Sequence, residues 1–290
     1  MRINAHQHFW IYNREEYSWI SDSMKVLRND FLPADLLPLL KQSDLDGSVA
    51  VQARQSLEET RWLLKLAAQY DFIKGVTGWI DLCSVEAENQ IAEFAADPKF
   101  VGVRHVLQDE PDDLFMLKDS FLEGISLLKK FNLVYELLIF PRHLPHAVQL
   151  AKKFPDQIFV LDHIAKPLIS DKILSPWKEW IQQLAIQPNV FCKLSGMVTE
   201  ASWKSWSRSD FDPYLDVIFD SFGPFRLMIG SDWPVCTLAS GYKSTLQIVI
   251  DYIVSKRPGD MELILGRNAE RIYDLKSKVH PEKANWEGSL

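Results

Sequence analysis

The sequence predicts an α/β fold, a (β/α)8 barrel of the TIM type built as a single domain. Short apolar runs alternate with helical patterns along almost the whole chain, and eight such runs fit within its 290 residues. Alternation of this kind indicates parallel strands joined by crossover helices. No glycine-rich nucleotide-binding loop follows the first run, so a closed barrel is favoured over an open doubly wound sheet.

Each predicted strand is a short apolar run, and most are followed by a segment of helical character. Ser56 and Glu59 have capping-box spacing at the start of one such helix, and Ile91, Phe94 and Ala95 form an apolar face of the next. The predicted strands span residues 1–10, 48–53, 76–82, 100–107, 133–140, 158–163, 190–195 and 227–230. The predicted helices span residues 57–70, 85–96, 120–131, 143–154, 176–187, 210–222 and 244–256.

Two segments depart from this alternation. Residues 9–33 form a long connection rich in aromatic side chains, among them Trp10 and Trp19. Long connections inside compact domains are usually functional, and this one is either a plug that closes one end of the barrel or a lid over a substrate. The barrel is expected to occupy residues 1–275, followed by a polar tail at 276–290 to which no function is assigned.

The composition is that of a globular protein, with 47% hydrophobic and 24% charged residues. A net charge of −7 without a run of Lys and Arg argues against nucleic-acid binding. Three scattered cysteines cannot build a disulfide framework, and we expect a reducing cytoplasmic location. No segment approaches the length of about 18 apolar residues that a membrane helix needs, and no secretory signal is recognisable.

The first strand carries His6, Gln7 and His8. In an extended strand alternate side chains share a face, so the two imidazoles point to the same side. Such a pair can hold a divalent metal or bind a substrate directly. Taken alone, the pattern is equally typical of two hydrogen-bonded structural histidines.

Polar side chains recur where the other predicted strands end, which is where barrels of this type have their active sites. His163 alone is equally typical of a core histidine, Arg104 of a salt bridge and Asp232 of a helix cap. Lys193 is interpreted as structural rather than catalytic. The residues at the strand ends are His6, His8, Trp79, Arg104, His105, Asp162, His163, Lys166, Lys193, Ser195 and Asp232. Burying so many charged and imidazole groups is costly, so their convergence predicts an active site.

Six motifs resemble the amidohydrolase superfamily, and within it the branch that holds L-fuconolactonases and L-rhamnonolactonases. They are HQHFW at 6–10, GVTGWIDL at 75–82, GVRH at 102–105, LDHIAKP at 161–167, CKLSG at 192–196 and GSDWP at 230–234. The resemblance extends over about residues 3–275. It implies an enzyme of carbohydrate metabolism that hydrolyses the ester bond of a sugar-derived lactone, an L-fucono-, L-rhamnono- or related aldonolactone.

Lactone hydrolysis requires an activated water, a polarised carbonyl and a proton for the departing ring oxygen. Asp232 is the expected general base. The expected polarising groups are Arg104, His163 and Lys166. Sugar rings have apolar faces and hydroxyl rims, so the expected substrate-binding residues are Trp10, Trp79, Trp233 and His105. The alternatives are a metal-dependent decarboxylase or dicarboxylate lactonase on the same barrel and, less favoured, a non-catalytic binding barrel.

The chain departs from the pattern of the two-metal amidohydrolases. Where those enzymes usually carry a bridging Lys or Glu on strand four and a His on strand five, this chain has Arg104, His105 and Glu136. We therefore expect one divalent metal, zinc first, or none; His6 and His8, with His163 and Asp232, would hold it. The expected partner is a small-molecule sugar lactone, with no nucleic acid and no membrane, and assembly into a homo-oligomer is left open.

Overall fold

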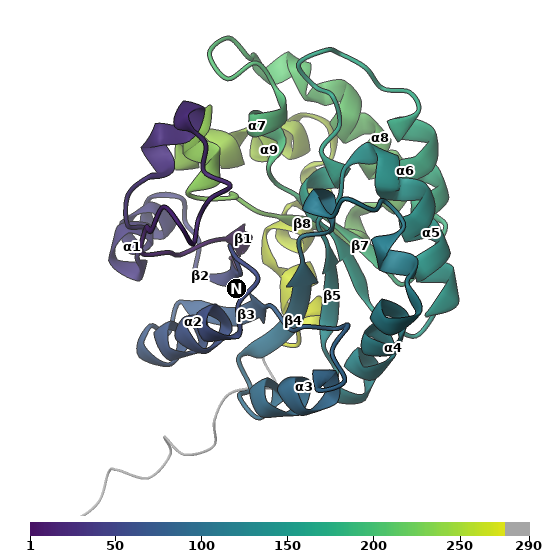
Figure 1. Ribbon diagram of the computed structural model, residues 1–290. Helices are drawn as coiled ribbons and strands as arrows, with labels where there is room; N and C mark the ends of the chain where they lie inside the picture. The colour runs from purple at the N-terminus through teal and green to yellow at the C-terminus, as the bar shows by residue number, and fades with distance from the viewer. Residues whose placement is uncertain (276–290) are drawn as a thin grey trace, which may run out of the picture.

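The computed structural model describes residues 1–275 of the chain and contains an eight-stranded parallel sheet in the order β1 to β8. The sheet curls into a nearly closed barrel with helices around it, which confirms the predicted fold class (Figure 1). The strands are β1 Ile3–Gln7, β2 Gly47–Val51, β3 Ile73–Gly78, β4 Phe100–His105, β5 Val134–Leu137, β6 Phe159–Leu161, β7 Val190–Leu194 and β8 Leu227–Ile229. The polar tail predicted at 276–290 lies outside the described residues.

Most of the α-helices lie around the outside of the barrel. They are α1 Pro33–Gln42, α2 Leu57–Gln69, α3 Ala87–Ala95, α4 Asp119–Leu128, α5 Leu144–Lys153, α6 Trp177–Ala185, α7 Met197–Glu200, α8 Asp212–Phe222, α9 Tyr242–Lys256 and α10 Asn268–Ile272. The capping interaction predicted for α2 is present, because Ser56 Oγ accepts a hydrogen bond from the Glu59 amide at 3.2 Å. The sequence interpretation did not predict α1, α7 and α10.

β3 begins three residues earlier than predicted and ends at Gly78. The apolar run continues past that point, but the Thr60 hydroxyl donates to the Trp79 carbonyl at 3.0 Å and accepts from the Trp79 amide at 2.9 Å. These side-chain bonds take the place of strand pairing. Trp79 therefore belongs to the connection after β3.

Two apolar regions stabilise the barrel. The larger region fills the space between the sheet and the surrounding helices. The smaller one lies inside one end of the barrel, where Val49, Val101 and Val160 pack with Ile272 and Tyr273 from the C-terminal segment. That segment, yellow in Figure 1, closes this end. The opposite end, where the strands finish, is left for polar side chains.

The barrel closes between β1 and β8 through an irregular seam. Gln7 and Trp233 form a single parallel bridge instead of a continuous ladder. The His8 amide donates to the Trp233 carbonyl at 2.7 Å, and the Asp232 amide donates to the His6 carbonyl at 2.9 Å. Asp232 adopts a left-handed backbone with φ of 56°. The seam thus fixes the first and last strand ends beside each other.

The long connection 9–33 folds into a small apolar cluster of its own, formed by Trp10, Tyr17, Ile20 and Leu27. Its short 3-10 helix η1, Asp22–Leu27, lies against a second one, η9, Val235–Leu238, which follows β8. Figure 1 shows this purple segment beside the lime-green segment after β8. The connection therefore belongs to the wall at the strand-end side of the barrel.

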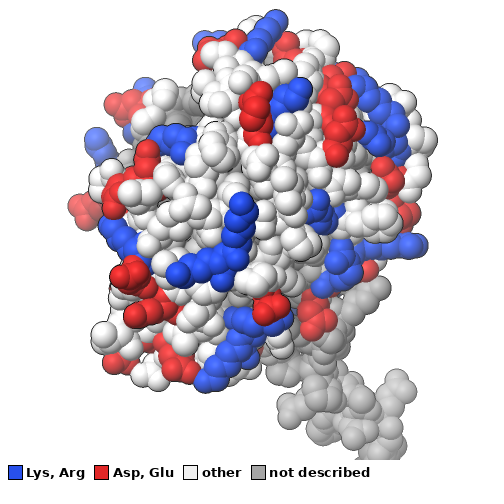
Figure 2. Space-filling model, turned by 90° about the vertical axis from the view of Figure 1, so that its right-hand side faces the viewer, with Lys and Arg blue, Asp and Glu red and all other residues white. Residues whose placement is uncertain are grey.

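Among residues 1–275, no helix combines the length and the apolar character needed to cross a membrane. Figure 2 shows the helical face at the right of Figure 1, where basic and acidic side chains are interspersed. Neither sign gathers into a continuous patch on that face.

Candidate active site

A cavity of about 580 Å³ opens at the end of the barrel where the strands finish. Its wall combines residues from strand ends, from the 9–33 connection and from the segments after β4, β7 and β8. The lining residues are His8, Ser18, Trp19, Met24, Ala53, Arg54, Gln55, Arg104, Val106, Gln108, Asp109, Leu138, His163, Lys166, Thr199, Glu200, Trp203, Asp232, Val235 and Leu238. The volume is that of a small-molecule site.

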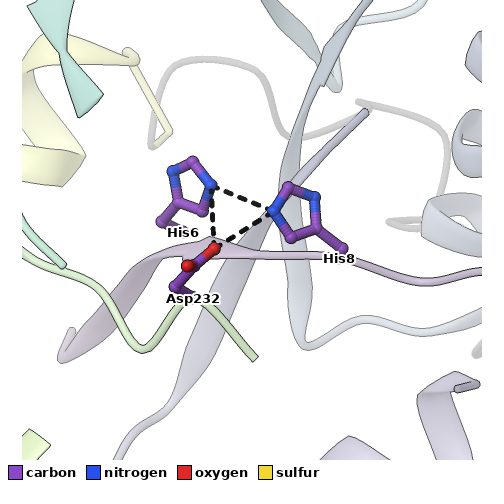
Figure 3. Close-up of side chains that lie close together, drawn as sticks. All are labelled: His6, His8 and Asp232. Atoms are coloured by element: carbon purple, nitrogen blue, oxygen red, sulfur yellow. Dashed lines mark hydrogen bonds and ion pairs between the residues drawn. The ribbon is translucent and has the colours of Figure 1, made fainter. Parts of the chain in front are cut away.

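At the base of this cavity, Asp232 converges with His6 of β1 and with His8, which follows β1 directly (Figure 3). Asp232 Oδ1 lies 3.3 Å from His8 Nε2 and 3.6 Å from His6 Nε2, and the two imidazole nitrogens are 3.2 Å apart. His163 Nε2 completes the group at 3.8 Å from the same carboxylate oxygen. The structure therefore brings together four residues that the sequence placed on three different strands.

Outer contacts fix the orientation of these rings. His8 Nδ1 donates to the Val51 carbonyl at 2.8 Å, which orients the ring with Nε2 towards Asp232. His163 Nδ1 contacts the Ser195 hydroxyl at 2.9 Å. Each contact comes from a neighbouring strand end, so the barrel itself sets the ring directions.

His163 stands on an unusual stretch of backbone. His163, Ile164, Ala165 and Lys166 all have positive φ, between 49° and 61°. Such a conformation is rare for residues with a side chain, and for the β-branched Ile164 it costs on the order of 1–3 kcal/mol. The Trp177 indole holds the turn by donating to the Ile164 carbonyl at 2.8 Å. This turn directs both His163 and Lys166 into the cavity.

Burial and mutual contact set the charge state of the group. Burial works against the ionised carboxylate, yet His163, His8 and His6 together hold the pKa of Asp232 below its ordinary value. Burial also lowers the pKa of His163 to about 4 and the pKa of His6 well below its ordinary value. At neutral pH Asp232 is a carboxylate, while His6 and His163 are neutral imidazoles.

These donors match the requirements of a single divalent metal ion. Ligands of tetrahedral zinc lie about 2.0–2.1 Å from the ion, which separates neighbouring ligand atoms by about 3.3 Å. The distances of 3.2, 3.3 and 3.6 Å among His6, His8 and Asp232 fall around that value. Arg104 Nη1 lies 3.4 Å from His6 Nε2, so a fixed positive charge borders the same donor set and disfavours a second ion.

A buried network of charged side chains contacts His6 at Nδ1. Lys193 Nζ lies 2.6 Å from Glu136 Oε2, 3.2 Å from Asp162 Oδ1 and 3.2 Å from His6 Nδ1. Arg104 Nη1 binds the other oxygen of Asp162 at 3.1 Å. Two cations and two anions thus balance each other in the middle of the barrel. Lys193 lies in this network and does not line the cavity, in agreement with its interpretation as a structural residue.

Four of the residues expected to bind substrate do not line the cavity. Trp10 is fully buried in its own cluster, with Nε1 donating to the Asn29 carbonyl at 2.9 Å. Trp233 is 3% exposed and packs against Phe9 and Phe31. In the remaining pair, Trp79 Nε1 donates to His105 Nδ1 at 3.3 Å, and His105 Nε2 contacts Glu110 Oε1 at 2.7 Å. These contacts occupy the polar groups of Trp10, Trp79 and His105. None of the four lines the cavity, and their substrate-binding role stays a prediction.

The aromatic side chains that do line the cavity are Trp19 and Trp203. Trp19 was noticed only as part of an aromatic segment, and Trp203 and Glu200 were missed because they follow β7 by several residues. No local pattern marks them, since only the fold brings these segments to the cavity. His143 lies away from the cavity, with Nε2 2.9 Å from Asp113 Oδ1.

Comparison with known proteins gives a match to the amidohydrolase family over residues 3–275. An L-fucono-1,5-lactonase from Burkholderia multivorans is 39% identical over 286 residues, which cover 95% of this chain and 96% of that protein. An L-rhamnono-gamma-lactonase from Scheffersomyces stipitis is 27% identical over 164 residues, about half of each chain.

Solved structures extend this comparison. A crystal structure of an amidohydrolase from Burkholderia multivorans with bound zinc is 39% identical, with a TM-score of 0.91 over 94% of this chain and 99% of that one. A 2,6-dihydroxybenzoate decarboxylase from Rhizobium has a TM-score of 0.68 over 94% of this chain and 98% of that one, at 14% identity. The latter likeness concerns the fold alone.

Proposed function

Since this chain belongs to the amidohydrolase family, we propose that it hydrolyses a sugar-derived lactone to the corresponding aldonic acid. The relatives named as L-fucono-1,5-lactonase and L-rhamnono-gamma-lactonase support this activity. The observation that carries the proposal is the ionised Asp232, held among His6, His8 and His163 at the base of a cavity. The protein is a hydrolase of lactone ester bonds.

We assign the general base to Asp232, which accepts a proton from water as the water oxygen bonds to the lactone carbonyl carbon. The carbonyl oxygen becomes an oxyanion, which the nearby cationic groups of Arg104 and Lys166 stabilise. One such preorganised donor is worth about 3–4 kcal/mol of barrier. The ring C–O bond then breaks, and the ring oxygen takes the proton from Asp232 to give a hydroxyl group.

We further propose that one divalent ion is held by His6, His8 and Asp232, with His163 beside them. The ion would supply Lewis-acid polarisation of the lactone carbonyl. Two observations support it, the spacing of the three donor atoms and the zinc bound in a relative of 39% identity. The structural neighbours named as decarboxylases share too little sequence to support that reaction here.

A lactone panel tests the activity. Purified protein is assayed with L-fucono-, L-rhamnono-, D-galactono- and L-galactonolactones, and acid release is followed with a pH indicator. We expect kcat/KM to be highest for one of these aldonolactones and absent in the Asp232→Asn variant. Inactivity on the whole panel would overturn the proposal, and carbon dioxide release from an aromatic acid would identify a decarboxylase instead.

Three expectations stay predictions from the sequence: a cytoplasmic location, the absence of nucleic-acid binding and the state of assembly. They bear on where the enzyme works and not on the chemistry of its site.

A further inference from the structure

The cavity has one apolar side. Met24 of η1, Ala53 after β2, and Val235 and Leu238 of η9 all line it. These four side chains are partly buried and pack against the apolar cluster of the 9–33 connection. They therefore form a continuous surface with a rigid backing, which we call the apolar wall.

The other sides of the cavity carry polar groups beside the apolar side chains of Val106, Leu138 and Trp203. Gln108 and Asp109 line it after β4, and Thr199 and Glu200 line it after β7. Lys166 adds a cation from the turn after β6. Hydroxyl groups of a sugar find partners on these sides, whereas the apolar wall offers them none.

The apolar wall begins next to the general base. Val235 follows Asp232 by three residues, and the Cys236 amide donates to the Asp232 carbonyl at 2.9 Å, which holds η9 against the base. In a 1,5-lactone the ring oxygen joins the carbonyl carbon to C5. The substituent on C5 is therefore only three bonds from the carbon that water attacks, and it must lie close to Asp232 as well.

The two named relatives act on lactones that share one feature. L-fucono- and L-rhamnono-lactones are both 6-deoxy compounds, so each has a methyl group at C6 where most aldonolactones have a hydroxymethyl group. A methyl group gains free energy on an apolar surface, whereas a hydroxyl placed there loses its hydrogen bonds to water.

Building on the proposed function, we propose that the apolar wall binds the C6 methyl group and selects 6-deoxy aldonolactones over their 6-hydroxy counterparts. Apolar pockets discriminate against an added hydroxyl by about 10²-fold at most. We therefore expect a preference of about 10- to 100-fold in kcat/KM.

Two lactones that differ at one position test the proposal. L-fucono-1,5-lactone and L-galactono-1,5-lactone have the same configuration at C2 to C5 and differ only by the hydroxyl on C6. The ratio of their kcat/KM values is measured for the unaltered protein and for the Val235→Thr and Leu238→Asn variants, which nearly conserve side-chain volume. Both variants should lower the ratio by about 5-fold or more, mainly through KM for the 6-deoxy lactone.

Val254→Thr is the matched control, because Val254 is 59% exposed on α9 and does not line the cavity. It should leave the ratio unchanged, and a thermal unfolding curve for each variant shows that it is folded. A ratio near one in the unaltered protein, or a ratio unchanged in both folded cavity variants, would overturn the role of the wall. Inactivity on both lactones would instead count against the lactonase function itself.

Discussion

Asp232 has the most contacts with the site histidines, because its Oδ1 faces three imidazole nitrogens within 3.8 Å. In the Asp232→Asn variant the shape is retained but the proposed base is lost, so we expect kcat to fall by about 10³-fold or more. Binding of the lactone should persist and can be measured by calorimetry or by the change in tryptophan fluorescence on binding. A variant with nearly normal kcat would remove Asp232 from the role of general base.

Gly196 makes room for His163. A Cβ built on Gly196 would lie 2.4 Å from His163 Nδ1 and 2.5 Å from its Cγ, and the residue has φ of +62°. Gly196→Ala should therefore displace the imidazole and reduce kcat by about 10-fold or more, in addition to straining the backbone.

Gly223 supplies a matched control for this variant. It has nearly the same φ of +66°, but nothing lies within 4 Å of its added Cβ. Gly223→Ala should lose stability in urea unfolding through backbone strain, since ψ of Gly223 is 166°, and it should keep its kcat. Equal losses of activity in the two variants would mean that backbone strain, and not displacement of His163, causes the effect.

At the scale of single residues, the sequence predicts those site members that end strands. His6, His8, His163 and Asp232 are found in this way, since parallel strands bring their carboxyl ends to one side of a barrel. The substrate-binding role expected of Trp10 and Trp233 stays a prediction. Both lie near His8 and Asp232 in the chain, but their large apolar rings are buried among aromatic neighbours and do not line the cavity.

At the scale of elements, a buried carboxylate joins the 9–33 connection to the barrel. Glu59 of α2 is 1% exposed, and its Oε2 accepts hydrogen bonds from the amides of Ala53 and Arg54 at 3.0 Å. Its Oε1 accepts from the Tyr17 hydroxyl at 3.2 Å. Arg54 also pairs with Glu16 at 2.6 Å. These contacts attach two parts of the cavity wall to each other.

Burial raises the pKa of Glu59 from 4.5 to about 7. Between these values the folded protein keeps a proton that the unfolded chain has lost, so this group makes the free energy of unfolding fall as pH rises from 4.5 to 7. The loss is on the order of 3 kcal/mol. Glu59→Gln should flatten this part of the pH dependence in urea unfolding, while Glu58→Gln, on the exposed side of the same turn, should not. Parallel profiles for all three proteins would contradict the assignment.

The boundaries of elements are less predictable from sequence than their order. α1 carries start signals, with Pro33 at its first position and Asp35 Oδ2 accepting from the Leu32 amide at 2.8 Å. A proline inside a helix is unfavourable, so Pro38 argues against a helix in the sequence. Burial of Leu36 and Leu40 stabilises α1 in spite of Pro38. The end of β3 depends on the Thr60 hydroxyl, which lies 19 residues away in the chain.

At the scale of the whole molecule, the order of eight strand and helix units follows from the alternation of patterns, but the closing seam does not. The bridge between Gln7 and Trp233 joins the two ends of the barrel and forms only when all eight strands are in place. Since His8 and Asp232 meet across this seam, metal binding at the site depends on the complete fold. The metal proposal can therefore be tested through stability, independently of activity.

An ion that binds only the folded protein stabilises it by RT ln(1 + [L]/Kd), or about 2.7 kcal/mol at a hundredfold excess over Kd. We expect zinc to raise Tm by about 5 °C and a chelator to reverse the change, with one ion per chain by elemental analysis. His8→Gln should lose most of this shift, because it removes one of three donors. His143→Gln, which alters an imidazole bound to Asp113 outside the cavity, should keep it. If zinc and chelator both leave Tm unchanged and less than about a tenth of an equivalent of metal is bound at full activity, His6, His8 and Asp232 act on the lactone without an ion.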